Sequence, residues 1–290
     1  MKSYTTLRNL YGSLTNDTST TNLTLGDQLI NDGIRRMISK HHNFYFLQVA
    51  ATDLTVASQS AYPKPYNFKK ANAYKVTVGT TSYRLKFVTS RAKWDKINET
   101  SYESDIPEWV YEEGDDYNIY PTPSSAGNTI TVNYTVNVVD LANTDYTTGT
   151  VSITNGSAIV TGSGTTFTAA MVGRYIKVNA DGNWHKIASY TSATVITLER
   201  EYGGTTVTGG AYTIGDMPIL PDGYHMYPVY FAVAHYWHMN GEPVKGREYE
   251  RMFNDGSSAL KIEHGSKYNN PVVDDGEVET VKNPNLYVEL

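Results

Sequence analysis

Residues 149–215 differ in composition from the sequence on either side, and this difference constrains the fold more than any other feature. The block begins TGTVSITNGSAIVTGSGTTFTAAMVGRYIKV and ends TTVTGGAYTIG, so Thr, Gly, Val, Ile and Tyr dominate it. Such β-branched and aromatic residues, punctuated by glycines, favour short strands joined by turns. With about 67 residues and roughly six strands, the block is expected to form an all-β module, as a small sandwich or barrel.

A hairpin is predicted at the start of this block, at the dipeptide Asn155-Gly156. Asn-Gly favours the left-handed backbone of a two-residue turn. Such a turn would place Val151 opposite Val160. Ile153 would then face Ala158 on the same side of the hairpin. Four further strands are expected, namely Tyr175–Val178, Trp184–Tyr190, Val195–Leu198 and Ala211–Ile214.

Two helices are predicted near the N-terminus, a short one around Thr6–Leu14 and a longer one at about 25–41. Thr24 is the expected cap of the longer helix, because a threonine hydroxyl can accept a hydrogen bond from the first turn. The apolar residues that recur there at helical spacing are Leu25, Leu29, Ile30, Ile34, Met37 and Ile38.

Residues 48–139 are expected to form antiparallel β-structure. One hairpin joins Tyr74–Val78 to Thr81–Leu85 across Gly79-Thr80, a candidate type II′ turn. A second joins Glu108–Glu112 to Tyr117–Tyr120. Strict alternation from Ile130 to Val138 then predicts a long strand with one apolar face.

Two more helices are predicted after the Thr-rich block, at Tyr227–Met239 and about 243–264. Gly241 ends the first and Pro243 suits the first turn of the second, so the pair is expected to be an antiparallel helical hairpin. Gly256 is a candidate break or kink. Residues 266–290 are polar and acidic with a short apolar tip, which predicts an extended arm.

The predicted fold class is therefore α+β. A helical bundle, made by the N-terminal helix and the C-terminal helical hairpin, accompanies an antiparallel β subdomain. An all-β domain, an Ig-like sandwich or a small barrel, is inserted into this core. The expected boundaries are 1–148 and 216–265 for the core, 149–215 for the inserted domain and 266–290 for the arm.

Composition excludes several function classes. The formal net charge is −6, from 24 basic and 30 acidic residues, and no basic run stands out, which argues against tight nucleic-acid binding. The chain has no cysteine, so it has no disulfide, thiolate metal site or cysteine nucleophile. No stretch has the length of a membrane span or the pattern of a signal peptide. These features fit assembly in a reducing cytosol.

Candidate chemistry is sparse. His235 and His238 lie one helical turn apart, with His225 nearby, and two such histidines can share a metal. A partly buried helix face explains them more simply, since no acidic residue lies between them. The acidic turn Glu112–Asp116 has the residue types of a glycosidase or calcium site, but acids with glycine are ordinary in turns. Because no catalytic or phosphate-binding motif is present, we expect no enzymatic activity, metal or cofactor.

The segments LGDQLINDGIRRMISKHHNFYFL, YNIYPTPSSAGNTITVNY and PDGYHMYPVYFAVAHYWHMNG together resemble the head–tail connector (adaptor) proteins of tailed bacteriophages. The resemblance covers about 23–148 and 216–264. Residues 149–215 resemble the small Thr/Gly-rich β modules of phage structural proteins, and they occupy a gap where most connectors turn directly into an LPDGYH-like segment. This is a departure from the family pattern, and it leaves the role of the module open.

The resemblance implies a homo-oligomeric ring, commonly of twelve copies, which docks on the portal protein in the virion neck. The ring would continue the DNA channel without sequence-specific DNA binding and would present a platform to tail or nozzle proteins, with tail fibres reached through the inserted domain. The residues expected to pack between subunits are Ile34, Ile38, Tyr230, Trp237, Tyr249 and Phe253. The residues expected to form the portal- or neighbour-binding tip of the arm are Asn285, Leu286, Tyr287, Val288 and Leu290.

Two other functions remain open at this point. A carbohydrate- or receptor-binding tail protein would also suit the many tyrosines, 24 in all, and the β module. A secreted glycan hydrolase would need the acidic turn to lie in an aromatic cleft. An adaptor should bind portal rings, whereas a receptor binder should bind cells or glycans by itself.

Overall fold

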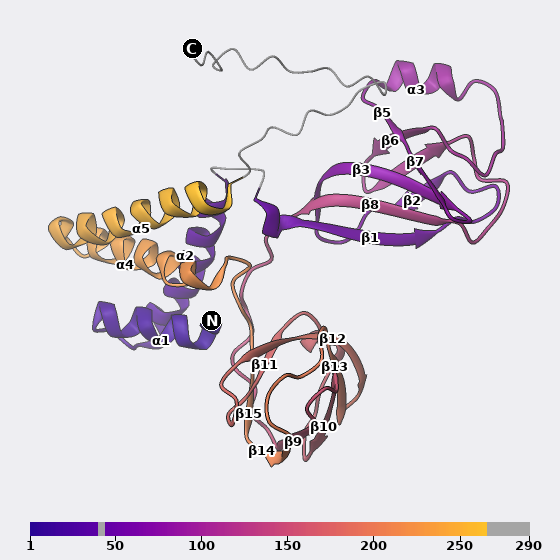
Figure 1. Ribbon diagram of the computed structural model, residues 1–290. Coiled ribbons are helices and arrows are strands. Elements are labelled where there is room, and N and C mark those ends of the chain that lie inside the picture. The colour runs from indigo at the N-terminus through magenta and orange to yellow at the C-terminus, as the bar shows by residue number, and fades with distance from the viewer. Residues whose placement is uncertain (40–43, 266–290) are drawn as a thin grey trace, which may run out of the picture. The chain divides into compact units, whose positions relative to one another are not determined.

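The computed structural model describes residues 1–39 and 44–265 and shows a mixed α+β chain that forms two compact units (Figure 1). One unit contains the described N-terminal residues together with 138–265, and the other contains 44–137. The predicted arm, with Asn285, Leu286, Tyr287, Val288 and Leu290, lies outside the described residues. Among the described helices, none combines the length and apolar character needed to cross a membrane.

The first unit contains four helices, and one of them contacts the other three. This helix, α4, has apolar residues around nearly its whole circumference, which is the pattern of a helix buried on all sides. It packs against α1, α2 and α5. Both C-terminal helices have their predicted bounds. The helices are α1 (Tyr4–Thr15), α2 (Thr20–Ser39), α4 (Tyr227–Met239) and α5 (Pro243–His264).

The prediction of the start of α2 was wrong by about one turn. Thr24 does not cap the helix but lies inside it, where its hydroxyl donates to the Thr20 carbonyl at 2.8 Å. The cap is Ser19, whose Oγ accepts from the Asn22 backbone N–H at 3.3 Å. A polar run hid this boundary, because Ser and Thr suit both caps and loops.

Gly256 does not break α5, which runs without interruption across it. The glycine is buried, and a Cβ built on it would lie 2.1 Å from the ring of Tyr227 on α4. A glycine is therefore present because the two helices approach closely there, rather than because the helix bends.

The second unit contains two four-stranded sheets. The first has the order β1-β8-β3-β4 and the second β2-β7-β6-β5. The strands of the first sheet are β1 (Gln48–Leu54), β3 (Phe68–Val78), β4 (Thr81–Arg84) and β8 (Thr129–Val136). Those of the second are β2 (Ala61–Pro63), β5 (Lys86–Val88), β6 (Trp109–Glu113) and β7 (Asp116–Tyr120).

Both predicted hairpins of this unit are confirmed. Val78 pairs with Thr81 and Val76 with Tyr83, across a turn in which Gly79 has a φ of 60°. The turn of the second hairpin is shorter than predicted, since Glu113 pairs with Asp116. Tyr62, Tyr74 and Tyr117 form a buried aromatic group here, with ring centroids 5.7 and 4.9 Å apart. Burial raises the pKa of all three phenols.

The expectation of purely antiparallel β-structure in this region was wrong in two respects. A short helix, α3 (Arg91–Ile97), follows β5, and β5 pairs with β6 in parallel. Trp94 anchors the helix, because its buried ring stacks on Tyr111 at a centroid distance of 5.5 Å. The long connection through α3 lets the chain re-enter the sheet in the same direction, as parallel pairing requires.

The Thr-rich block forms one seven-stranded antiparallel sheet in the order β14-β9-β10-β13-β12-β11-β15. Figure 1 shows this sheet curving around an interior, where its buried residues form a hydrophobic core that includes Val160, Ile196 and Tyr202. The strands are β9 (Thr150–Ile153), β10 (Ile159–Ser163), β11 (Tyr175–Val178), β12 (Trp184–Ser192), β13 (Val195–Leu198), β14 (Val207–Gly210) and β15 (Tyr212–Gly215).

The predicted register of the first hairpin in this sheet was wrong by two residues. Val160 pairs with Ile153 rather than with Val151. The loop is wider than two residues because its backbone binds another segment: Gly156 N–H donates to the Tyr202 carbonyl at 2.8 Å. The side-chain amide of Asn155 also donates, to the Gly204 carbonyl at 2.9 Å. A shift of two preserves side-chain parity, so the apolar residues still face the core.

The two ends of the block meet at a polar junction. Tyr146 and Ile214 form an antiparallel bridge, and each donates its N–H to the other's carbonyl at 2.8 Å. The buried Arg174 donates to the carbonyls of Thr144 and Ile214 at 2.8 and 3.2 Å. Asp145 accepts from the Ser3 hydroxyl at 2.9 Å, which joins the junction to the residue that caps α1.

Candidate functional site

Strand β1 is an unprotected sheet edge. Its seven residues pair regularly with β8, and no described strand pairs with its other side. Six of the seven are exposed, including Val49 and Leu54, whose exposed fractions are 40% and 57%. Natural edge strands are commonly blocked by charged residues, proline, a bulge or shortness, and of these β1 has one charged residue, Asp53, whose carboxylate accepts from the Leu54 N–H at 2.8 Å. Its free backbone groups can therefore accept a strand from another chain segment.

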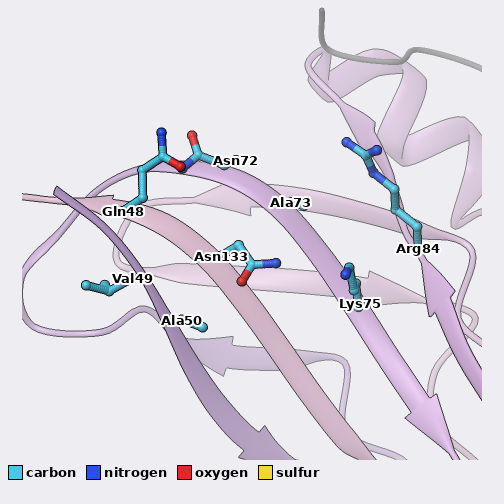
Figure 2. A pocket seen from close by; sticks show the side chains of 8 residues that line it. All are labelled: Gln48, Val49, Ala50, Asn72, Ala73, Lys75, Arg84 and Asn133. Carbon is cyan, nitrogen blue, oxygen red and sulfur yellow. The ribbon is translucent and has the colours of Figure 1, made fainter. Parts of the chain in front are cut away.

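A polar hollow of about 510 Å³ lies on the face of this sheet (Figure 2). All four strands contribute to it, and Figure 2 shows Lys75 and Arg84 projecting from β3 and β4, with Asn133 on β8 between them and β1. The lining residues are Gln48, Val49, Ala50, Asn72, Ala73, Lys75, Arg84 and Asn133.

The hollow is cationic although the chain as a whole is acidic. Lys75 and Arg84 are directly opposite each other in the β3–β4 register, and like charges in that position destabilise a sheet. Lys69 and Lys70 lie exposed further along β3. Within the described residues, none of these four cations has an ion-pair partner at 4.0 Å or less. Cations and amides without a carboxylate suit the binding of an anionic partner.

The three histidines singled out in the sequence do not come together. His225 is fully buried, with Nε2 2.9 Å from the Leu220 carbonyl and Nδ1 3.1 Å from the Lys2 N–H. His235 and His238 are exposed on α4, and His238 lies 3.7 Å from Glu250. Within 1–39 and 44–265, no group of three His, Cys, Asp or Glu side chains is arranged to hold a metal.

The buried His225 makes stability pH-dependent. Desolvation lowers its pKa below the ordinary value of about 6.5, so the unfolded chain binds the proton more readily. The stability that the neutral His225 contributes is complete above the ordinary pKa of about 6.5. It is lost as the pH falls below that pKa, by at most about 1.4 kcal/mol per pH unit. We expect the free energy of unfolding, measured by urea denaturation, to fall more steeply between pH 7 and 5 in the wild type than in His225→Gln. Parallel pH profiles would contradict this assignment.

The residues predicted to pack between subunits fall into two groups. Ile34, Ile38 and Phe253 are at most 2% exposed within the chain's own helical core. Tyr230, Trp237 and Tyr249 are half-buried. The ring centroids of Tyr230 on α4 and Tyr249 on α5 are 6.1 Å apart. The Lys245 Nζ lies over the Trp237 ring, 4.5 Å from its centroid. Intersubunit contact stays a prediction for all six residues, and the second group is the more accessible.

The acidic turn is occupied by structural ion pairs. Glu112 lies 3.4 Å from Lys64, and Glu113 pairs with Arg91. Sequence reasoning missed the open edge and the hollow. The signal that could have found them is the set of cations on two strands joined by the Gly79-Thr80 turn, which brings Lys75 and Arg84 together.

A known protein family matches the part of the chain that contains the open edge and the hollow. The family model described as SU10 adaptor protein matches residues 2–159, which is more than half of the 290 residues. The matched range contains α1, α2 and the whole unit of residues 44–137, with the open edge and the hollow. No curated protein matches the chain. The chain therefore belongs to the SU10 adaptor protein family, a family of bacteriophage adaptors.

Proposed function

We propose that this protein is a structural, non-catalytic component of the virion neck. Copies of it close into a ring, commonly of twelve, that docks on the portal, continues the DNA channel and presents a platform for tail assembly. The family match over residues 2–159 carries this proposal. The acidic net charge of −6 supports it as well, since a channel wall of that sign lets DNA pass without holding it.

The open β1 edge also supports a ring. Closed rings form from heterologous interfaces, in which one surface of a subunit meets a different surface of the next. An unpaired edge strand beside a cationic hollow is one half of such an interface. The half-buried tyrosines Tyr230 and Tyr249 and the indole of Trp237 supply further candidate contacts on the helices.

We further propose that the helices form the bundle of the adaptor core and that residues 149–215 are a separate inserted domain, at the ring's periphery, that contacts tail or fibre proteins. Its strands hydrogen-bond among themselves, and its ends are joined by the Tyr146–Ile214 bridge. The tip residues 285–290 of the arm are proposed to reach the portal or a neighbouring copy.

The proposal is tested by mixing the purified protein with portal rings and imaging the mixture by electron microscopy. We expect ring-shaped density on the portal, and we expect it to persist when a short linker replaces 149–215. Loss of folding in that variant would reject the separate domain. Density found only at fibre tips of virions, or binding of the protein alone to host cells or glycans, would reject the adaptor role in favour of receptor binding.

A further inference from the structure

We propose that the cationic hollow on the β1-β8-β3-β4 sheet binds the acidic segment 274–279 of a second copy of this chain. The inference rests on the proposed function in one respect, that copies of the protein assemble with one another. It assigns a partner to the hollow, which the family match does not do.

Charge complementarity identifies the segment. Residues 274–279 read DDGEVE, so Asp274, Asp275, Glu277 and Glu279 lie within six positions. No lysine or arginine lies between Lys267 and Lys282. The hollow offers the opposite composition, with Lys75 and Arg84 facing each other and no carboxylate in its lining. A partner carboxylate would relieve the repulsion between these two cations, and charge-assisted bonds to an arginine are among the stronger polar contacts.

The hollow spans the face of all four strands, from β1 to β4. Its rim includes Gln48, Val49 and Ala50 of β1, whose outer edge has no partner strand within the described part of the chain. A segment that lies across the sheet face in the hollow can place its carboxylates at Lys75 and Arg84, whereas a strand added beside β1 would lie about 14 Å from β3 and further from β4. Affinity and position would then both come from the opposite charges.

The stoichiometry fits a contact between copies. Eight residues lie between Gly265 and Asp274, so the acidic segment can begin at most about 30 Å from the end of α5. Each copy supplies one hollow and one acidic segment, so the same contact can repeat from copy to copy. A repeating contact between two different surfaces is the arrangement that closes a ring.

Disulfide trapping tests this contact directly, because the full chain has no cysteine of its own. One preparation carries Ala73→Cys in the hollow and another carries Val278→Cys in the acidic segment. After mixing under assembly conditions and mild oxidation, we expect disulfide-linked heterodimers. The matched control replaces Ala73→Cys by Ser189→Cys, an exposed position on β12. A heterodimer yield no greater than in the control would overturn the proposal. A third chain carries both Ala73→Cys and Val278→Cys, and a disulfide that forms only within this chain would overturn the proposal as well.

Charge reversal shows whether the contact depends on the opposite charges of the hollow and the segment. Lys75→Glu with Arg84→Glu in the Ala73→Cys chain should lower the heterodimer yield about tenfold, the ratio that corresponds to about 1.4 kcal/mol. Replacing the four acids by lysine in the Val278→Cys chain should restore the yield. If reversal abolishes binding of duplex DNA but leaves the cross-link unchanged, the hollow is a DNA-binding site and the proposal is wrong.

The same variants distinguish this contact from the proposed function. A charge-reversed chain that no longer cross-links to its neighbour but still forms density on portal rings shows that the adaptor role stands through other contacts. A wild-type chain that cross-links but never binds portal rings shows the reverse, with the contact present and the adaptor role rejected.

Discussion

Replacement of Gly26 by alanine is expected to destabilise the helical unit by about 2 kcal/mol, even though alanine is the better helix former. A Cβ at this position would lie 2.3 Å from the ring of Tyr11. That ring cannot move aside, since it is fully buried and its hydroxyl donates to the Asn22 side chain at 2.9 Å. The contact between α1 and α2 must therefore open.

The matched control is Gly246→Ala in α5. There the obstacle is the ring of His238, 2.8 Å from the added Cβ, but His238 is exposed and, among the described residues, only its contact with the exposed Glu250 opposes a turn of the ring toward solvent. Alanine at 246 should be neutral or stabilising by up to about 1 kcal/mol, the difference in helix propensity. Thermal unfolding of the two variants measures both effects. Equal shifts would show that glycine is not required by the close approach at position 26.

Removal of the Arg174 side chain by Arg174→Ala is expected to cost about 3–5 kcal/mol, the range for deleting one member of a buried charged group. The buried guanidinium donates to the carbonyls of Thr144 and Ile214. Burial lowers the pKa of Arg174, and the carboxylates of Asp216 and Asp145 oppose that shift, which keeps the group charged. Without it, these two acids lose their counter-ion.

Arg200→Ala is the control, because Arg200 is an exposed arginine of the same sheet region. It should change stability by less than about 0.5 kcal/mol. Chemical denaturation and hydrogen exchange of the 144–146 and 214–216 amides give the two readouts. If both arginine variants behave alike, the junction does not depend on the buried charge.

The helices were the most predictable part of the fold. α4 and α5 have their predicted bounds because Gly241 and Pro243 signal an end and a start through backbone geometry alone. The start of α2 was missed because serine and threonine signal caps and loops equally well. The hairpin at Gly79-Thr80 was predicted in register, whereas Asn155-Gly156 was not, since that dipeptide binds residues 202–204 from a distant part of the sequence.

The open β1 edge and the cationic hollow were less predictable than the fold. The sequence FKKANAYKV in β3 shows no clean alternation, because the β3–β8 register shifts twice, between Phe68 and Lys70 and between Ala71 and Ala73. At each shift one extra residue is inserted, so the side chains that follow point to the other face of the sheet. The amino-acid composition of the strand does not reveal this change. The open edge is a property of strand order, which depends on contacts between β1 and a strand 75 or more residues later.

The Tyr146–Ile214 bridge brings the two ends of residues 149–215 together, and the contact of Arg174 with the Thr144 carbonyl holds them there. A segment tied at its ends in this way presents closely spaced ends to the rest of the chain. Many unrelated folds have termini that lie close together. Under the domain organisation proposed above, this position would be a graft point, at which a different inserted domain changes what the particle displays while the adaptor core stays the same.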